Sequence, residues 1–221
     1  MSDTREAGYY GYARPDVLAL IPPGCRRLLD LGCGRGELGR RLQGRDGALR
    51  ITGIEWEPAA ARVAAGHYDR VLVGSLEGEL PRLVEAGERF DLIVMADILE
   101  HTAAPGTILA QAATLLIEGG HAVVSVPNVS HYSVGLGLLR DRWDYAERGI
   151  LDRGHLRFFT QRSFRELARS AGLSVLRERR NYRLWERRGL RHDRWVAIPI
   201  SLGLLRHLFV FQNLFLLRKG D

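Results

Sequence analysis

Short apolar runs alternate along this chain with longer stretches in which apolar residues recur at helical spacing. The short runs have the composition of buried strands and end at turn or polar residues; they lie at 26–32, 51–55, 70–74, 90–96 and 121–126. The helical stretches between them lie at 37–43, 58–66 and 106–116, with proline or glycine at the junctions. Because alternating strands and helices form βαβ units, the pattern predicts an α/β fold with a doubly wound parallel sheet.

The pattern changes after Pro127. A long segment rich in aromatic residues and arginine precedes a helical stretch at 161–172 and two further candidate strands at 173–180 and 209–219. We expect the long segment, at about 129–160, to form a lid over the active site. The chain has 221 residues, of which 46% are hydrophobic, and it shows no repeat or linker. It is therefore predicted to form one domain over 1–221.

The most apolar part of the chain, at 195–217, invites comparison with a membrane span. Polar and helix-breaking residues interrupt it and argue against a span: Pro199, Arg206, His207, Gln212 and Asn213. Core packing with a final strand is the favoured interpretation. An interfacial helix at about 200–205 that contacts lipid is the alternative.

The N-terminus and the cysteines bear on the compartment. The first residues are polar and charged and lack the apolar core of a secretory signal. The two cysteines, Cys25 and Cys33, have no metal-ligand spacing and suggest no disulfide framework. We expect a cytoplasmic protein, with peripheral membrane contact as the alternative.

The positive charge is uneven along the chain. The net charge is +6, Lys219 is the sole lysine, and sixteen arginines fall between Arg140 and Arg194. No recognisable RNA or DNA module accompanies this charge, so we favour a solvated surface over nucleic acid as a partner. An anionic substrate would approach the arginine-rich half.

A glycine-rich turn follows the first strand. Asp30 ends that strand, and the next residues form a GxGxG pattern made of Gly32, Cys33, Gly34 and Gly36. Glycine lets a backbone turn tightly and approach a ligand. A carboxylate at the position of Asp30 would repel a pyrophosphate, so it favours a cationic ligand over a dinucleotide.

Two further positions complete this candidate binding site. Glu55 ends the second strand about twenty residues after the glycine turn, where a carboxylate can accept both ribose hydroxyl protons, and Trp56 can pack on an adenine. In the third unit, Ser75 and Leu76 lie where the adenine edge is expected, with serine where an aspartate is common.

These residues, together with Phe90-Asp91 and Gly119-Gly120, resemble the class I S-adenosylmethionine-dependent methyltransferases. The resemblance implies a Rossmann-like sheet of seven strands in the order 3-2-1-4-5-7-6, with strand 7 antiparallel. It implies S-adenosylmethionine as cofactor. It also places Arg14 and Ala96 near the methionine end of that cofactor.

Candidate reactive residues follow the fourth and fifth strands. Parallel sheets bind ligands at the carboxyl ends of their strands, so these residues face the substrate. Asp97, Glu100 and His101 follow the fourth strand and share one face if a helix begins there. His131 follows the fifth strand, and His155 comes later in the lid.

The DILEH and VSVPN motifs with the later histidine resemble ubiquinone-pathway O-methyltransferases and small-RNA 2′-O-methyltransferases. That resemblance implies a divalent metal, Mg²⁺, Mn²⁺ or Zn²⁺, held by Asp97, Glu100, His101 and His155 as a Lewis acid. Asp97 stands here in place of the usual glutamate. Two alternatives are open: a metal-free general base at His155, His101 or His131, and a structural role for Glu100 and His101.

The segment 130–160 resembles bacterial methyltransferases that are encoded with, or fused to, glycosyltransferases of surface-polysaccharide assembly. This implies that Tyr132, Trp143 and Tyr145 stack on a sugar, although they could instead pack the lid onto the sheet. The leading hypothesis is O-methylation of a sugar, glycan or other small metabolite. RNA 2′-O-methylation and a non-catalytic cofactor-binding protein are the alternatives.

Overall fold

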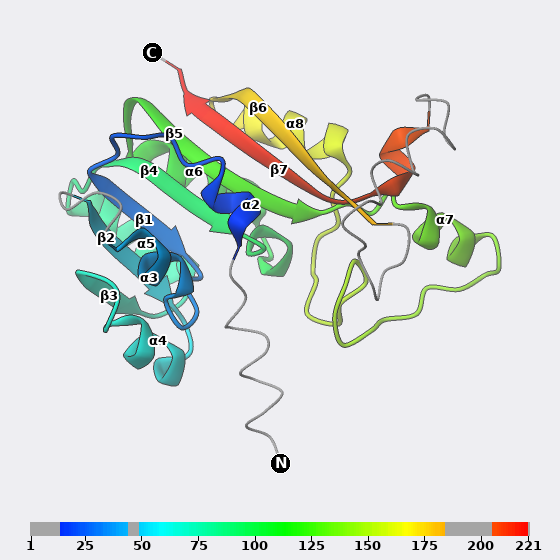
Figure 1. The fold of residues 1–221 in the computed structure, drawn as a ribbon, viewed down its shortest axis with the longest axis horizontal. Coiled ribbons are helices and arrows are strands. Elements are labelled where there is room, and N and C mark those ends of the chain that lie inside the picture. The colour runs from blue at the N-terminus through cyan, green and yellow to red at the C-terminus, as the bar shows by residue number, and fades with distance from the viewer. Residues whose placement is uncertain (1–13, 44–48, 184–204, 221) are drawn as a thin grey trace.

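The computed structural model describes residues 14–43, 49–183 and 205–220 and contains a seven-stranded sheet (Figure 1). Its order is β3-β2-β1-β4-β5-β7-β6, with β7 antiparallel to both neighbours, which confirms the predicted topology. The strands are β1 Arg27–Leu31, β2 Arg50–Glu55, β3 Arg70–Val73, β4 Phe90–Ala96, β5 Leu116–Pro127, β6 Leu173–Tyr182 and β7 Val210–Lys219.

Helices cover both faces of the sheet (Figure 1). They are α2 Pro15–Leu18, α3 Glu37–Leu42, α4 Pro58–Ala64, α5 Leu76–Glu85, α6 Pro105–Leu115, α7 Tyr132–Leu138 and α8 Gln161–Ser170, with 3₁₀ turns η1 Leu99–His101 and η2 Arg206–Phe209. Side chains of α5, α6 and α8 form one apolar cluster with the sheet, and side chains of α2 and α3 contribute to the other. The sheet is therefore buried between two cores, as its nearly continuous apolar strands require.

Helix α5 was not among the expected elements. Gly78 and Pro81 lie inside it, and both residues disfavour a helix interior. The Ser75 side chain caps it by accepting a hydrogen bond from the Gly78 amide at 3.2 Å, and Leu80 and Leu83 bury one face. Tertiary burial thus outweighs the unfavourable local residues.

The expected lid is anchored at both of its ends. Asn128 forms a parallel bridge with Phe159, and the Val129 amide donates to the Phe159 carbonyl at 2.9 Å. Between these ends the chain forms α7 and a turn that projects beyond the carboxyl end of β5 (Figure 1). The role of 129–160 as a lid stays a prediction.

The apolar stretch near the C-terminus ends in β7, as expected. Among the described residues, no helix combines the length and hydropathy needed to cross a bilayer. The interfacial helix considered at 200–205 falls almost wholly outside the described residues.

The packing of α8 on the sheet rests on a stacked aromatic pair, Phe164 and Phe215, whose fully buried rings have centroids 4.4 Å apart. We predict that Phe164→Ala lowers the free energy of unfolding by about 3–5 kcal/mol, because it removes a buried ring and leaves a cavity. Chemical denaturation measures this change. The control Arg169→Ala, on the exposed face of the same helix, should change it by less than about 0.5 kcal/mol. Equal effects of the two substitutions would contradict the packing described.

Candidate functional site

The glycine turn after β1 packs against β2. Gly32, Gly34 and Gly36 have φ values of 72°, 56° and 82°, in the left-handed region that favours glycine. A Cβ atom on Gly36 would lie 2.8 Å from the Cα atom of Ala64, so the turn also has no room for a side chain there. The Gly32 and Cys33 amides donate to the Ile54 carbonyl at 2.9 and 3.1 Å. These contacts fix the turn at the carboxyl edge of the sheet, next to the end of β2.

Asp30 and Glu55 are buried side by side at the ends of β1 and β2. Their exposed fractions are 4% and 3%. Glu55 accepts hydrogen bonds from the amides of Gly34 at 2.8 Å and Glu57 at 3.0 Å, and Asp30 accepts one from the Tyr68 hydroxyl at 2.6 Å. Neither acid has an ion-pair partner among the described residues, and two buried carboxylates of this kind form a site for a positively charged ligand.

Burial dominates the ionisation of Asp30. It raises the pKa of this carboxyl to about 7, and the negative charge of Glu55 adds to the rise, while the hydrogen bond from Tyr68 opposes it. A bound cation would favour the charged form of Asp30. The geometry agrees with the cationic ligand inferred from the sequence.

The remaining predicted cofactor residues surround this turn. Trp56 is 68% exposed beside Glu55, where its ring is free to cover a ligand. The Ser75 hydroxyl is used as the cap of α5, and Leu76 is buried. The Cys33 thiol packs toward Gly53 of β2, so Cys33 offers its backbone rather than its sulfur to a ligand. Contact of these residues with a cofactor stays a prediction.

A polar network occupies the end of β4, where Ala96 is followed by Asp97. The Asp97 carboxylate accepts hydrogen bonds from Arg14, from Gln212 on β7 and from Ser125 on β5, the last at 2.8 Å. Asp97 itself has a φ of 55°, unusual for a residue with a side chain. The network brings Arg14 to the carboxyl edge of the sheet, and its place near the methionine end of a cofactor stays a prediction.

The structure corrects the predicted metal set at Asp97. We expected a helix there that would align Asp97 with Glu100 and His101, but the chain forms the short 3₁₀ turn η1 instead. The Asp97 carboxylate is held by Arg14 and lies outside the cluster that Glu100, His101 and His155 form. The contacts of Asp97 with Arg14, Ser125 and Gln212 therefore determine where its carboxylate lies, and the spacing of Asp97 from Glu100 and His101 does not.

Glu100, His101 and His155 come together as a compact trio. One potential ligand atom from each residue lies within 4.8 Å of the others, and the imidazole rings meet edge to face with centroids 4.8 Å apart. Glu100 is 1% exposed, and among the described residues neither of its carboxylate oxygens has a hydrogen-bond partner. A buried, unpartnered carboxylate of this kind calls for a ligand, an ion or water.

The two histidines are oriented alike. Nδ1 of His101 lies 3.0 Å from the Gly154 carbonyl oxygen, and Nδ1 of His155 lies 2.9 Å from the Ile150 carbonyl oxygen. Because a carbonyl only accepts, Nδ1 carries the proton in each ring, and in the neutral tautomer Nε2 keeps its lone pair. Burial lowers the pKa of His155 and raises that of the Glu100 carboxyl. Two neutral imidazoles and one carboxyl group fit a divalent cation.

His131 serves the structure and is not free to act as a base. It is fully buried, and its Nδ1 and Nε2 atoms each lie 2.8 Å from an oxygen, of the Ser133 hydroxyl and the Arg183 carbonyl. The ring also caps α7. Its position shortly after β5 suggested a catalytic role, but both ring nitrogens are already engaged by Ser133 and Arg183, which favours a structural role.

Sequence reasoning missed three residues that support the site: Tyr68, Ser125 and Gln212. Ser125 stands within the VSVPN motif, so its position at the end of β5 was a usable signal. Tyr68 and Gln212 reach Asp30 and Asp97 across 38 and 115 residues of sequence, and no local pattern marks such contacts.

Comparison with known proteins places this geometry in a family. Residues 8–178 match a family model described as a methyltransferase domain. The chain is similar to the ubiquinone biosynthesis O-methyltransferases of Azorhizobium caulinodans, at 34% identity over 126 residues, and Cereibacter sphaeroides, at 31% over 162 residues. These alignments cover 56% and 72% of this chain but 49% and 64% of the relatives. The chain thus spans between about half and two thirds of the length of these relatives.

Solved structures share the fold. A SAM-dependent methyltransferase from Archaeoglobus fulgidus has a TM-score of 0.70 at 17% identity, with 99% of this chain and 100% of that chain covered. The N-methyltransferase NodS of Bradyrhizobium japonicum, solved with S-adenosyl-L-homocysteine, has a TM-score of 0.60 at 17% identity, with 94% and 85% covered. The fold is therefore that of the SAM-dependent methyltransferases. Within that class, the chain belongs to the methyltransferase domain family.

We predict that the unfolding free energy depends on pH through Asp30. Folding raises the pKa of this carboxyl from 3.8 to about 7, so the folded state binds the proton more tightly than the unfolded state. Stability from this group is complete below the unfolded pKa and is lost as the pH rises toward 7. Without ligand, the difference in unfolding free energy between wild type and Asp30→Asn should fall by about 3 kcal/mol between about pH 5 and about pH 8.

Denaturant titrations at matched ionic strength measure this difference, and both proteins share all other titrating groups. Tyr68→Phe should move the fall to higher pH, because it removes the hydrogen bond that favours the charged carboxylate. A difference that stays constant with pH would show that Asp30 keeps an ordinary pKa.

Proposed function

We propose that this chain is an S-adenosylmethionine-dependent O-methyltransferase that acts on a hydroxyl group of a sugar, a glycan or another small metabolite. The observation that carries the proposal is the trio of Glu100, His101 and His155 at the carboxyl edge of β4, the strand next to the glycine turn of β1. Family membership supports methyl transfer, and the names of the curated relatives support an oxygen acceptor.

The glycine turn and the two acids are proposed to bind the cofactor. The carboxylate of Glu55, fixed by the amides of Gly34 and Glu57, can accept protons from ribose hydroxyls. Asp30 places negative charge where the amino group of the cofactor would reduce the cost of its burial. When bound, S-adenosylmethionine supplies the electrophilic methyl group. The chain then contributes by aligning the acceptor oxygen with that methyl group.

The trio is proposed to hold a divalent cation, with Mg²⁺, Mn²⁺ and Zn²⁺ as candidates. Glu100 offers an unpartnered carboxylate, and His101 and His155 offer Nε2 lone pairs whose direction the backbone carbonyls fix. When bound, such an ion supplies a Lewis acid that lowers the pKa of the acceptor hydroxyl. Without an ion, Nε2 of His155 or His101 could take the hydroxyl proton, so the two mechanisms make different predictions.

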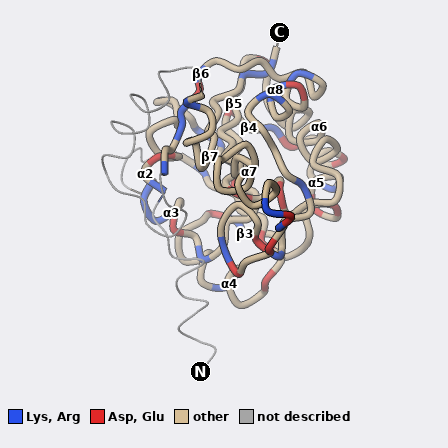
Figure 2. The backbone as a smooth tube through the Cα atoms, turned by 90° about the vertical axis from the view of Figure 1, so that its right-hand side faces the viewer, with Lys and Arg blue, Asp and Glu red and all other residues tan. Residues whose placement is uncertain are grey.

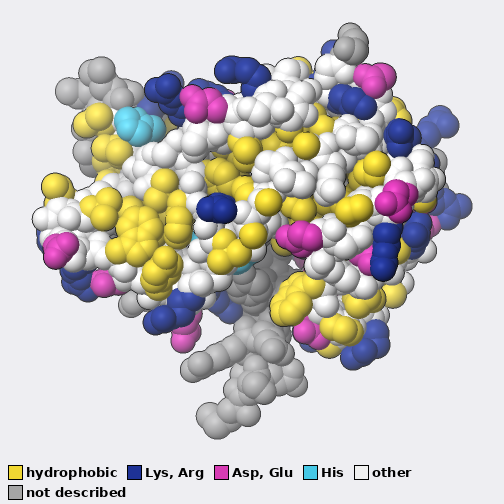
Figure 3. Space-filling model, turned by 180° about the vertical axis from the view of Figure 1, so that it is seen from behind, with side chains coloured by type: hydrophobic (Ala, Val, Ile, Leu, Met, Phe, Trp, Pro, Cys, Tyr) yellow, Lys and Arg dark blue, Asp and Glu magenta, His cyan; other side chains and the backbone are white. Residues whose placement is uncertain are grey.

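The lid is proposed to contact the acceptor through aromatic side chains. Trp143 and Tyr145 are 37% and 46% exposed, and the Trp143 ring meets Phe158 edge to face at 5.3 Å. Apolar side chains gather on the side of the molecule that carries the lid (Figure 3). Tyr132, by contrast, packs against His131 and Phe209, which favours a structural role for it.

A small acceptor is favoured over nucleic acid. Both α8 and β6 carry one glutamate among three arginines, and some of these arginines form ion pairs; Figure 2 shows the charges along the backbone. A continuous basic surface is what binding to a phosphate backbone requires. Glu166 and Glu178 interrupt such a surface in the part of the chain that the structure describes.

Methyl transfer and metal binding test this function together. Wild-type protein should bind S-adenosylmethionine in calorimetry and, when supplied with Mn²⁺, methylate members of a panel of sugars and small phenols and alcohols, and chelation should abolish this transfer. Manganese binding, measured by electron paramagnetic resonance, should be lost in Glu100→Gln and His155→Ala. Transfer should fall by about 10²-fold or more in both variants while cofactor binding persists.

His121→Asn is the matched control, because His121 lies well before the carboxyl end of β5, away from the trio. It should keep manganese binding and transfer. Transfer that survives chelation but falls in His155→Ala would favour the general base over the metal. No cofactor binding by wild type would overturn the proposed function.

We predict that Trp143→Ala weakens acceptor binding. Loss of one aromatic contact corresponds to a rise in the acceptor KM of roughly 2- to 10-fold, with little change in the affinity for S-adenosylmethionine. Steady-state kinetics with the best acceptor of the panel measure both constants. Leu139→Ala, in the same lid and 83% exposed, is the control and should leave both constants unchanged. An unchanged acceptor KM in Trp143→Ala would show that Trp143 does not contact the acceptor.

A further inference from the structure

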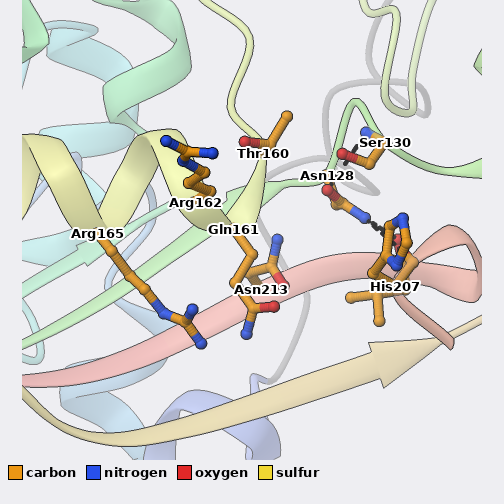
Figure 4. A pocket seen from close by; sticks show the side chains of 9 residues that line it. Asn128, Ser130, Thr160, Gln161, Arg162, Arg165, His207 and Asn213 are labelled. Carbon is orange, nitrogen blue, oxygen red and sulfur yellow. Dashed lines mark hydrogen bonds between the residues drawn. The ribbon is translucent and has the colours of Figure 1, made fainter. Parts of the chain in front are cut away.

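A cavity lies where the end of β5, the start of β7 and the N-terminus of α8 meet (Figure 4). Its volume is about 240 Å³. The lining includes polar and basic side chains from all three elements and from the turn before β7, among them Asn128, Thr160, Arg162, Arg165, His207 and Asn213. None of the residues that line it is acidic.

Asn213 has an unpartnered side chain in the wall of this cavity. It is 1% exposed, and among the described residues neither its amide nitrogen nor its carbonyl oxygen has a hydrogen-bond partner. A buried polar group without a partner costs free energy, so an amide at this position calls for a ligand or water. The side chain lies against the cavity in Figure 4.

The cavity lies on the face of the sheet opposite the Asp97 network. Side chains alternate along β7, so Gln212 donates to Asp97 on one face, and Asn213 points with Phe215 toward α8 on the other. Phe215 and Leu214 belong to the two different apolar cores, which confirms the alternation. The cavity is therefore separate from the Asp97 network, and Glu100, His101 and His155 are not among the residues that line it.

The charges at the cavity favour an anion. Arg162 and Arg165 are its two arginines, and both are on the first turns of α8, whose N-terminal end carries partial positive charge. Their guanidinium groups also pair with Glu166 and Glu178, which do not line the cavity. Since a guanidinium has five N–H donors, each arginine keeps donors for a ligand.

We propose that this cavity binds a small oxyanion of the phosphate class, either the free ion or the phosphoryl group of a small molecule. Arginine and hydroxyl donors suit phosphate oxygens, and the amide of Asn213 can donate to the same group. The volume lies below the range of about 300–1,000 Å³ typical of sites for drug-sized ligands, which favours a small anion.

The anion would bind at the base of the lid. Ser130 and Thr160, which both line the cavity, stand at the two ends of the segment 129–160. The ends are already joined by the hydrogen bond from the Val129 amide to the Phe159 carbonyl. A ligand held between Ser130, Thr160 and α8 would add a second connection between the two ends of the lid and would tie both ends to α8.

Thermal unfolding with increasing inorganic phosphate tests this proposal, with sodium chloride at matched ionic strength as the reference. Wild type should show a saturable rise in Tm. Arg162→Ala should weaken the apparent affinity for phosphate by at least about tenfold, because a charge-assisted hydrogen bond is lost. Arg169→Ala, an exposed arginine later in α8 that does not line the cavity, should keep the wild-type response.

Asn213→Leu is the second variant, and it separates loss of phosphate binding from loss of stability. It removes the unpartnered amide at similar volume, so its Tm without phosphate should equal or exceed that of wild type, while the phosphate response is lost. A parallel titration with glycerol 3-phosphate shows whether a phosphoryl ester or only the free ion binds. Equal responses of wild type, Arg162→Ala and Asn213→Leu, or no saturable response of wild type, would overturn the proposal.

Discussion

Burying a carboxylate costs free energy unless hydrogen bonds or a cation compensate for the lost water, and the described residues include three buried carboxylates near one edge of the sheet. Glu55 is stabilised by two backbone amides, Asp30 by a single hydroxyl, and Glu100 by no described hydrogen-bond donor. The fewer donors an acid has, the more its charged form depends on a bound ligand or ion. Glu55 is fixed before any ligand arrives, whereas the charged forms of Asp30 and Glu100 depend most on a bound cation.

The rest of the architecture keeps these acids where they are. The glycine turn after β1 lies close enough to the end of β2 for the Gly34 amide to donate to Glu55. The closeness of Ala64 leaves no room for a side chain at Gly36. The lid end brings His155 to Glu100 through backbone contacts, since the amides of Leu156 and Arg157 donate to the Glu100 carbonyl. The geometry of the site therefore comes from hydrogen bonds of the backbone more than from the flexible side chains.

The sequence was sufficient for features that depend on local pattern. The strand runs, the glycine turn and the position of Glu55 at the end of β2 agree with the structure. The strand order with its antiparallel β7 also agrees, but that expectation came from the resemblance to a family and not from local pattern. The sequence was not sufficient where a side chain chooses among distant partners. Asp97 pairs with Arg14 across 83 residues, and His131 contacts Arg183 across 52, so neither takes the role that its neighbours in sequence suggested. Such contacts depend on which distant segments become neighbours in the fold, and local periodicity does not indicate this.

The position of β7 has a consequence for the order in which the molecule can assemble. This strand follows all other described strands in the sequence, yet it lies between β5 and β6. During synthesis, which proceeds from the N-terminus, β6 leaves the ribosome before its only described strand partner exists. The edge of β5 and the edge of β6 that pair with β7 stay open until residues 210–219 emerge. In that interval the nascent chain exposes strand edges that can pair with other chains, so assistance by a chaperone is most useful just before the last strand arrives.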